Sequence, residues 1–222
     1  MKNLLLRMIF AASLVAFTAS AQPAREGIEW CDIWISHANE TNLPRVLLIG
    51  DSITRGYYSD VEKRLAGKAY VARLTTSAYL TDPMLNQQIA SVLQNLRFDV
   101  IHFNNGMHGW QHREETYRKA FPGFVAAIRK HAPKAKLIWA ATTPFRSTTP
   151  KGESNATKNE RVRARNAIAL EVVRKKKIPV DDLFTLMQGH PEYHSDDVHF
   201  NRDGIAVQAE QVAGQIAALL PK

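Results

Sequence analysis

Gly50-Asp51-Ser52-Ile53 is the stretch of this sequence best placed to carry a reactive side chain. It directly follows the apolar run 46–49, which is typical of a strand buried on both faces. A Gly-Asp-Ser corner at the end of such a strand exposes a hydroxyl, so Ser52 is a candidate nucleophile. That chemistry also requires a histidine to accept the proton, an acid to orient the histidine, and donors for an oxyanion. The alternative is that Asp51 and Ser52 only cap the helix that follows.

The rest of the chain alternates between apolar runs and amphipathic segments. Strands are expected near 46–49, 69–74, 100–103, 137–141 and 178–180, and helices near 57–65, 83–96, 114–131, 158–176 and 204–220. This alternation predicts a three-layer α/β/α sandwich around a central parallel sheet of about five strands, of the flavodoxin-like kind. Residues 45–222 form one domain in this interpretation. Residues 22–44 form a lead-in segment with no clear helical or strand period.

Polar residues follow the end of the expected strands. The carboxyl ends of parallel strands meet at one edge of the sheet, where such folds bind their ligands. The loops at that edge are 50–52, 75–77, 104–109 and 142–146, together with the segment 195–201 near the C-terminus. We therefore expect one site built from several loops.

The charge pattern argues against a nucleic-acid partner. The 222 residues carry a formal net charge of +8, but lysine and arginine are scattered over the expected helices and form no stripe with aromatic residues. The densest run, 174–177, closes an expected helix, where cations suit the negative end of the helix dipole.

Residues 1–21 have the features of an export signal peptide. Lys2 and Arg7 accompany an apolar core, and Ala19-Ser20-Ala21 supplies an A-x-A cleavage site. No later stretch has the length and apolarity of a membrane span, so the cleaved protein is expected to be secreted or periplasmic, with no integral membrane segment. Cys31 is the only cysteine, which excludes an intramolecular disulfide.

Two motifs together resemble the SGNH (GDSL-like) hydrolase family. Gly50-Asp51-Ser52-Ile53 is similar to the family's first block, and Asp196-Asp197-Val198-His199 is similar to its last, in matching order and at a matching separation. The resemblance implies Ser52 as nucleophile, His199 as general base and acid, and Asp196 as the residue that orients the imidazole. The chemistry agrees, because an acid three residues before a histidine can reach its Nδ1 and leave Nε2 facing the serine. Asp197 is the competing acid, placed second because adjacent side chains on an extended loop point apart.

The middle blocks depart from the family pattern. SGNH proteins usually carry Gly-x-Asn-Asp in the third block, where the asparagine donates to the oxyanion, but this chain has Gly106-Met107-His108-Gly109. His108 could donate through a ring N–H, or Asn104 or Asn105 could supply an amide; otherwise His108 is a loop histidine bonded to backbone. Ser77 is the best match to a second-block glycine whose backbone N–H lines the hole. The oxyanion candidates are thus Ser52, Ser77, Gly106 and His108.

Charged and aromatic residues near these loops are candidates for binding the substrate. Arg55 and Arg146 could bind a carboxylate such as that of a uronic acid, or they could bond to loop carbonyls. The full set of candidates is Asp51, Arg55, Asn105, Trp110, Arg146 and His194.

Together these expectations describe an exported serine esterase that removes small acyl groups, acetyl first among them, from carbohydrate. Its partner would be an acylated carbohydrate or another small ester, and the resemblance implies no metal or organic cofactor. A lipase or lysophospholipase and an acyltransferase of the same family are alternatives. From another class, a non-catalytic glycan-binding module would keep the scaffold, and His108 would then mark a lost oxyanion hole.

Overall fold

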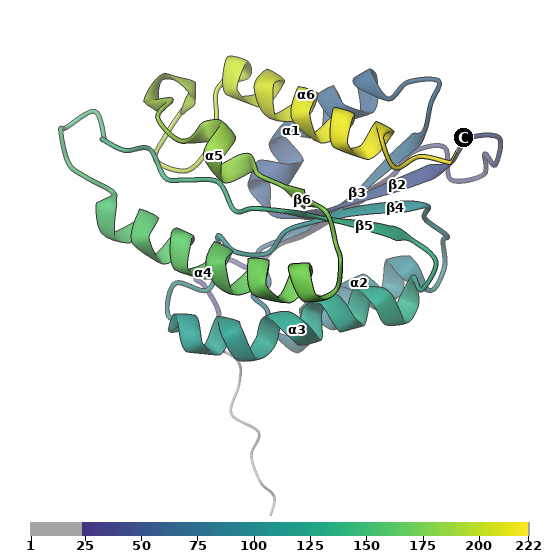
Figure 1. Ribbon diagram of the computed structural model, residues 1–222, viewed down its shortest axis with the longest axis horizontal. Helices are drawn as coiled ribbons and strands as arrows, with labels where there is room; N and C mark the ends of the chain where they lie inside the picture. The colour runs from purple at the N-terminus through teal and green to yellow at the C-terminus, as the bar shows by residue number, and fades with distance from the viewer. Residues whose placement is uncertain (1–23, 222) are drawn as a thin grey trace, which may run out of the picture.

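The computed structural model describes residues 24–221, which form one sheet with helices on both faces (Figure 1). The predicted three-layer α/β architecture is confirmed. The predicted export signal, 1–21, lies outside the described residues and stays a prediction. Within 24–221, no helix combines the length and apolar character needed to cross a bilayer.

Six strands form the sheet, in the order β1-β3-β2-β4-β5-β6. Their bounds are β1 Cys31–Ile35, β2 Arg45–Gly50, β3 Tyr70–Thr76, β4 Val100–Phe103, β5 Lys136–Ala140 and β6 Val180–Asp181. All neighbouring strands are parallel except β1 and β3, which are antiparallel. The central strand β2 is buried along its whole length, as its unbroken apolar run predicts.

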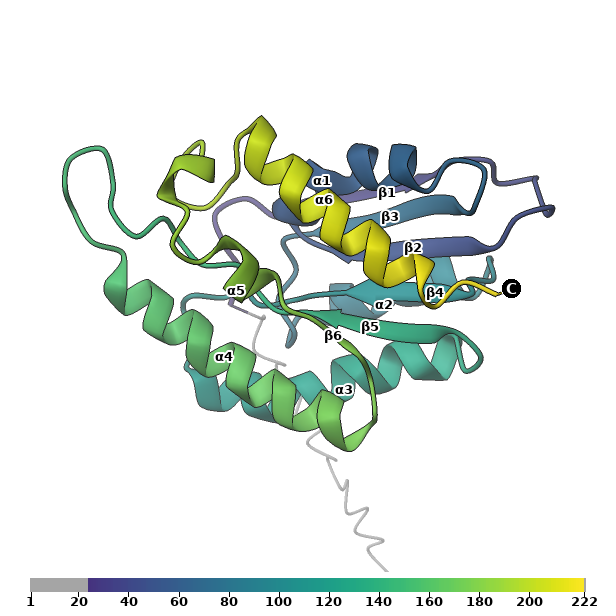
Figure 2. The same ribbon diagram turned by 45° about the horizontal axis from the view of Figure 1, so that its top comes forward.

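Helices cover both faces of the sheet (Figures 1 and 2). Their bounds are α1 Ser52–Arg64, α2 Pro83–Leu93, α3 Glu114–His131, α4 Ala156–Lys175, α5 Leu183–Met187, the short 3₁₀ helix η1 Pro191–Tyr193, and α6 Arg202–Ala217. Helices α1, α5 and α6 lie on one face, and α2, α3 and α4 lie on the other. Strands β2 to β5 run parallel, so the loops after them gather at one edge of the sheet.

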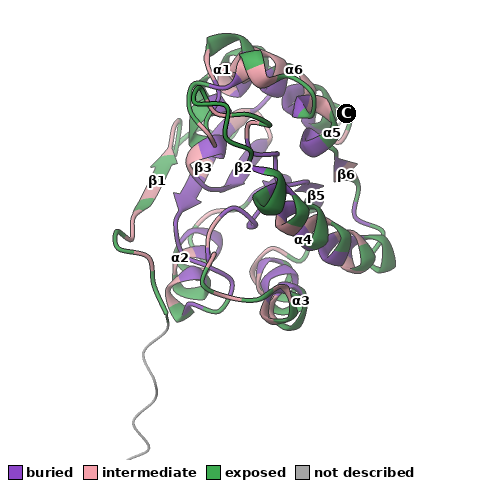
Figure 3. Cartoon of the chain, turned by 90° about the vertical axis from the view of Figure 1, so that its left-hand side faces the viewer, coloured by how far each residue is buried: buried purple, intermediate pink, exposed green. Residues whose placement is uncertain are grey.

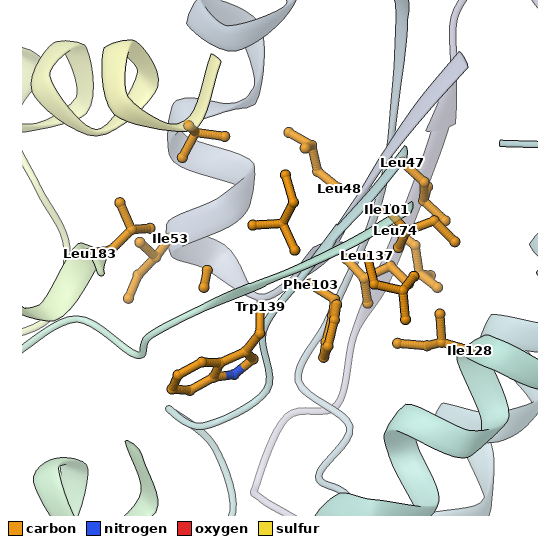
Figure 4. Packing of buried hydrophobic residues seen from close by; sticks show 14 of the residues in the cluster. Leu47, Leu48, Ile53, Leu74, Ile101, Phe103, Ile128, Leu137, Trp139 and Leu183 are labelled. Atoms are coloured by element: carbon orange, nitrogen blue, oxygen red, sulfur yellow. The ribbon is translucent and has the colours of Figure 1, made fainter. Parts of the chain in front are cut away.

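Apolar side chains from both faces of the sheet form the core. In Figure 3 the inner strands of the sheet are largely buried and β1 is not, while the helices are buried on their inner sides and exposed on their outer sides. Leu47 lies on the side of the sheet covered by Ile128 of α3, and its neighbour Leu48 lies on the side covered by Ile53 of α1 (Figure 4). Both leucines are completely buried. This packing fixes β2, and with it the corner that follows, on both sides.

Strand β1 is an element that the sequence pattern does not predict. Residues 22–44 carry no strand period, yet Cys31–Ile35 pairs with β3, with Ile33 opposite Leu74. The physical reason is its place at the edge of the sheet, where Ile33 is 42% exposed and Trp34 is 55% exposed. Backbone pairing holds the strand there, and its side chains need not alternate between core and solvent.

Candidate active site

Ser52 stands at the first position of α1, immediately beyond the end of β2. Asp51 caps the helix, because its carboxylate accepts the backbone N–H of Ile53 at 2.9 Å. A Cβ at Gly50 would overlap the side chain of Thr54, so only glycine allows this tight corner. Asp51 therefore has the capping role that was the alternative for this motif, while the Ser52 hydroxyl is left free for chemistry.

The structure brings Ser52, His199 and Asp196 together in one hydrogen-bonded chain. Ser52 Oγ lies 2.8 Å from His199 Nε2, and His199 Nδ1 lies 2.8 Å from Asp196 Oδ2. This is the order of groups that lets a histidine take a proton from a serine while a carboxylate holds its tautomer. The three residues come from the β2–α1 corner and from the loop before α6, so the fold closes a long separation in sequence.

Backbone N–H groups, as well as the imidazole, keep the Asp196 side chain ionised. Its Oδ1 accepts the backbone N–H of Val198 at 2.7 Å and that of His199 at 2.6 Å. Partial burial acts to raise the pKa of Asp196, but the hydrogen bonds from the His199 backbone and ring and from Val198 outweigh it and lower the pKa to about 2. Asp196 is thus ionised at neutral pH.

Asp197, the competing acid, has a different place in the loop. Its backbone carbonyl accepts the N–H of Arg146 at 2.9 Å, which ties the loop before α6 to the loop after β5. The side chain that contacts the His199 ring is that of Asp196. The geometry therefore favours Asp196 in the pairing.

His108 faces the same pocket as the Ser52 hydroxyl. Its Nδ1 lies 2.9 Å from Oε2 of Glu26, a residue of the segment that precedes β1. Its Nε2 is buried and has no hydrogen-bond partner among residues 24–221. The Ser52 N–H, in the first turn of α1, lacks an intrahelical acceptor. These two groups are the candidates that the structure leaves for an oxyanion hole.

Ser77 is not available as an oxyanion donor, contrary to expectation. Its backbone N–H donates to the carbonyl of Trp30 at 3.1 Å, and its hydroxyl donates to Glu29 at 2.6 Å while accepting the Trp30 N–H. The segment leading into β1 extends the pairing with β3 as far as Ser77 and uses these groups. The sequence pattern, which missed β1, could not predict this.

Asn104 and Asn105, two other donors expected in the loop after β4, have structural partners. The amide nitrogen of Asn104 donates to the carbonyl of Ala140, and that of Asn105 donates to the carbonyl of Ala78. Gly106 fits against Thr142 with no room for a Cβ. None of the three lines the pocket beside Ser52. They shape the loop that carries His108.

A pocket of about 510 Å³ opens beside the serine. Its lining residues come from six parts of the chain and are Glu26, Ser52, Met107, His108, Trp110, Phe145, Thr157, Lys158, Arg161, Val198 and His199. Trp110 and Phe145 pack edge to face, with ring centroids 5.3 Å apart. Arg161 lies over Trp110 at 5.0 Å and donates to Glu114, so much of its charge is balanced within the wall. The pocket lining therefore combines aromatic and apolar side chains with polar ones that include Ser52, His108 and His199.

Several predicted substrate residues lie away from this pocket. Arg55 stacks over Trp30 at 4.8 Å. His194 is buried against Phe200, with both ring nitrogens near backbone carbonyls, and burial lowers its pKa. Arg146 does not line this pocket but lines an open hollow that shares Val198 and His199 with it. Of the predicted substrate set, only Trp110 lines the pocket beside Ser52.

Seven pocket residues were missed by the sequence analysis. They are Glu26, Met107, Phe145, Thr157, Lys158, Arg161 and Val198. Met107 and Val198 lie inside the quoted motifs, and Phe145 lies in a loop already expected at this edge, so these had a signal. Glu26 and the start of α4 had none, because only the folded chain brings them near Ser52. A metal site is not evident among the described residues. Among them, no cluster of three or more histidine, cysteine, aspartate or glutamate side chains is arranged to hold a metal ion.

Solved structures similar to this chain include several hydrolases. A lipase/acylhydrolase from Enterococcus faecalis is 19% identical, with a TM-score of 0.62 over 81% of this chain and 98% of that one. Est24, a carbohydrate acetylesterase from Sinorhizobium meliloti, is 15% identical, with a TM-score of 0.59 over 79% of this chain and 99% of that one. An acetyl xylan esterase is 15% identical, with a TM-score of 0.60 over 78% of this chain and 99% of that one. At these identities the likeness shows the fold.

The family comparison is more specific. A comparison with curated protein sequences finds no match. The profile of the GDSL-like Lipase/Acylhydrolase family matches residues 48–207, a range that contains both the Ser52 corner and the Asp196–His199 loop. The chain belongs to the GDSL-like lipase/acylhydrolase family and is a hydrolase that acts on esters.

Proposed function

We propose that this protein is an exported serine esterase that removes small acyl groups, acetyl first among them, from carbohydrate. Ser52 attacks the ester carbonyl while His199 accepts its proton, and the alcohol leaves with that proton. The acyl-enzyme is then hydrolysed by a water that His199 activates. Asp196 keeps the imidazole in the tautomer that presents Nε2 to Ser52.

The observation that carries this proposal is the unbroken chain from Ser52 Oγ through His199 to Asp196, with 2.8 Å at each link. A cap or a loop contact would need one of these bonds, but not both in this order. The donors proposed for the oxyanion are the Ser52 N–H and, with its ring protonated, the otherwise unpartnered Nε2 of His108.

The carbohydrate part of the proposal rests on the pocket and on the structural likenesses. Trp110 and Phe145 offer ring faces and edges of the kind on which sugars pack. Two of the similar structures are described as an acetyl xylan esterase and a carbohydrate acetylesterase. Export is proposed from the sequence features of residues 1–21.

One observation favours a second candidate, a lipase. Met107, Trp110, Phe145 and Val198 give the pocket of about 510 Å³ a largely apolar wall, and such a wall also suits a longer acyl chain. The two candidates differ in which part of the substrate this wall holds.

Acetate release from a panel of acetylated polysaccharides tests the first candidate, with Ser52→Ala as the control for contaminating activity. Rates on a series of aryl esters from acetyl to long acyl chains separate the two candidates. A carbohydrate acetylesterase releases acetate from at least one polysaccharide and prefers the shortest chain. A rate that rises steadily with chain length, with no acetate released from any polysaccharide, would replace it by the lipase.

A further inference from the structure

Glu26 joins the segment before β1 to the loop after β4. Both of its carboxylate oxygens are used: Oε2 lies 2.9 Å from His108 Nδ1, and Oε1 accepts the backbone N–H of Gly109 at 3.0 Å. The segment is itself tied down, because Arg25 bonds to Asp82 at 2.6 Å and the carbonyl of Ala24 accepts from Gln111. Glu26 therefore fixes both the ring and the backbone of the loop that lines the pocket.

His108 presents a buried and unpartnered nitrogen as a result of this contact. Its Nε2 is shielded from solvent and has no partner among residues 24–221, although the residue lines the pocket with Ser52 and His199. The rings of Trp30 and His108 are close to perpendicular, with their centroids 6.3 Å apart. Buried polar atoms nearly always have a hydrogen-bond partner, so a partner supplied by the substrate is the natural completion.

The contact with Glu26 also decides which proton His108 carries. A carboxylate can only accept, so Nδ1 must hold a proton. A neutral imidazole has a single N–H, which leaves Nε2 as an acceptor in that form. Nε2 can donate only if the ring is protonated, and the Glu26 carboxylate then provides the opposite charge.

We propose that Glu26 is a positioning residue that orients His108 and balances its protonated ring, so that Nε2–H donates to the oxyanion formed when Ser52 attacks. The inference rests on the proposed esterase mechanism. As the bond from Ser52 Oγ to the carbonyl carbon forms, the carbonyl oxygen takes the electron pair and the serine proton moves to His199. His108 stabilises that oxygen by a hydrogen bond and transfers no proton.

The other charged groups around His108 are cations, so Glu26 is the group that can balance a protonated His108 ring. Arg165 of α4 donates to the His108 carbonyl at 2.7 Å. Lys158 and Arg161 of α4 line the same pocket, as does His199 from the loop before α6. Each of these is positive or becomes positive during the reaction, and each opposes a second charge on His108. Among the groups that line this pocket, Glu26 supplies the negative charge.

The proposal gives the two histidines different roles. His199 accepts the serine proton, whereas His108 donates through Nε2–H while Glu26 contacts its Nδ1. Loss of the Glu26 carboxylate should therefore slow turnover without weakening substrate binding, because the oxyanion exists only after Ser52 attacks.

The test measures kcat and KM at neutral pH on a soluble acetyl ester for wild type, Glu26→Ala, Glu26→Gln, His108→Asn and the double variant Glu26→Ala/His108→Asn, with circular dichroism to check folding. Glu26→Ala should lower kcat by about tenfold or more with little change in KM, toward the roughly 100- to 1000-fold loss typical of a missing oxyanion donor. With His108→Asn in place, Glu26→Ala should change kcat little, because an amide N–H donates without a counter-charge. In Glu26→Gln the amide can accept from Gly109 and donate to Nδ1, so a neutral His108 carries its proton on Nε2. This variant should exceed Glu26→Ala in activity.

Arg25→Ala is the matched control, because it loosens the same segment without touching His108, and it should lower kcat much less than Glu26→Ala. A loss of kcat on Glu26→Ala that is equally large with His108→Asn in place overturns the inference. A Glu26→Ala variant within twofold of the wild-type kcat does the same. Ser52→Ala distinguishes a failure of this inference from a failure of the proposed function. If wild type hydrolyses esters through Ser52 while Glu26→Ala changes nothing, only this inference fails. If Ser52 is not needed for hydrolysis, the proposed function fails, and the inference that rests on it fails as well.

Discussion

Ser52 is the residue whose removal should affect chemistry and spare the fold. Its side chain bonds to His199, while the cap of α1 is made by Asp51. Ser52→Ala should therefore lower ester hydrolysis by several orders of magnitude, with a thermal melting temperature close to that of wild type. Purified variant that keeps more than about a tenth of wild-type kcat would exclude Ser52 as the nucleophile.

Substitution of the two neighbouring acids, Asp196 and Asp197, should have very different effects on kcat. Asp196→Asn places an amide at His199 Nδ1 and disturbs the tautomer, and losses of about 10⁴-fold in kcat are known for such a change. Asp197→Asn leaves this contact intact, because Asp197 uses its backbone carbonyl toward Arg146. Steady-state kinetics of the two variants on one acetyl ester make the comparison. Equal losses, or a larger loss for Asp197→Asn, would contradict the pairing.

At the scale of elements, α4 holds the loop that carries His108. Arg165 is fully buried, and its guanidinium donates to the carbonyls of Gly106, His108 and Gly109 at 2.7 to 3.0 Å. Desolvation by burial lowers the pKa of Arg165, but the carboxylate of Glu114, 3.4 Å away, acts to raise it and offers a counter-charge. The loop is thus anchored both by Arg165 of α4 and by Glu26.

The Arg165→Met variant should be less stable to urea than wild type and should also have lower activity. Methionine fills most of the space but leaves buried carbonyls without donors, at a cost of about 3 kcal/mol. Urea unfolding at neutral pH measures this, and Arg163→Met, an exposed position on the same helix, is the control. If both variants unfold at the same urea concentration as wild type, the Arg165 bonds do not stabilise the loop.

Elements were predictable from the sequence where burial left a local apolar pattern. Strands β2 to β5 and the helices between them were predicted because their burial leaves an apolar signature that does not depend on distant residues. The start of α1 at Ser52, and not near residue 57, follows from the Asp51 cap, which the motif contains. Strand β1 left no such signature, since an edge strand is held by backbone bonds. Without β1, neither the loss of Ser77 as a donor nor the contact of Glu26 with His108 could be predicted.

For the molecule as a whole, the attachment of the N-terminal segment should depend on pH through Asp82. The hydrogen bond from Arg25 lowers the pKa of Asp82, whose side chain is 5% exposed. A carboxyl with a depressed pKa in the folded state binds protons more weakly there than in the unfolded chain. Its stabilising contribution is therefore complete above about pH 4 and is lost as the pH falls further.

Asp82→Asn should flatten this acid dependence. The amide oxygen can still accept the Met84 N–H and cap α2, but the charge that titrates is gone. The free energy of unfolding, measured with urea between pH 2.5 and 6, should fall less steeply below about pH 4 in the variant than in wild type. Parallel curves for the two proteins would show that Asp82 does not contribute to acid sensitivity.

The site draws on both ends of the described chain, and this has a consequence for when the enzyme becomes active. Ser52 and His199 are 147 residues apart, and Glu26 lies earlier still. Because a ribosome adds residues in order, Ser52 cannot pair with His199 in a nascent chain before His199 has been made, long after β2 and α1 are complete. If Ser52 and His199 act as proposed, a growing chain carries an inert serine through most of its synthesis and gains hydrolytic activity only after the loop before α6 has been made.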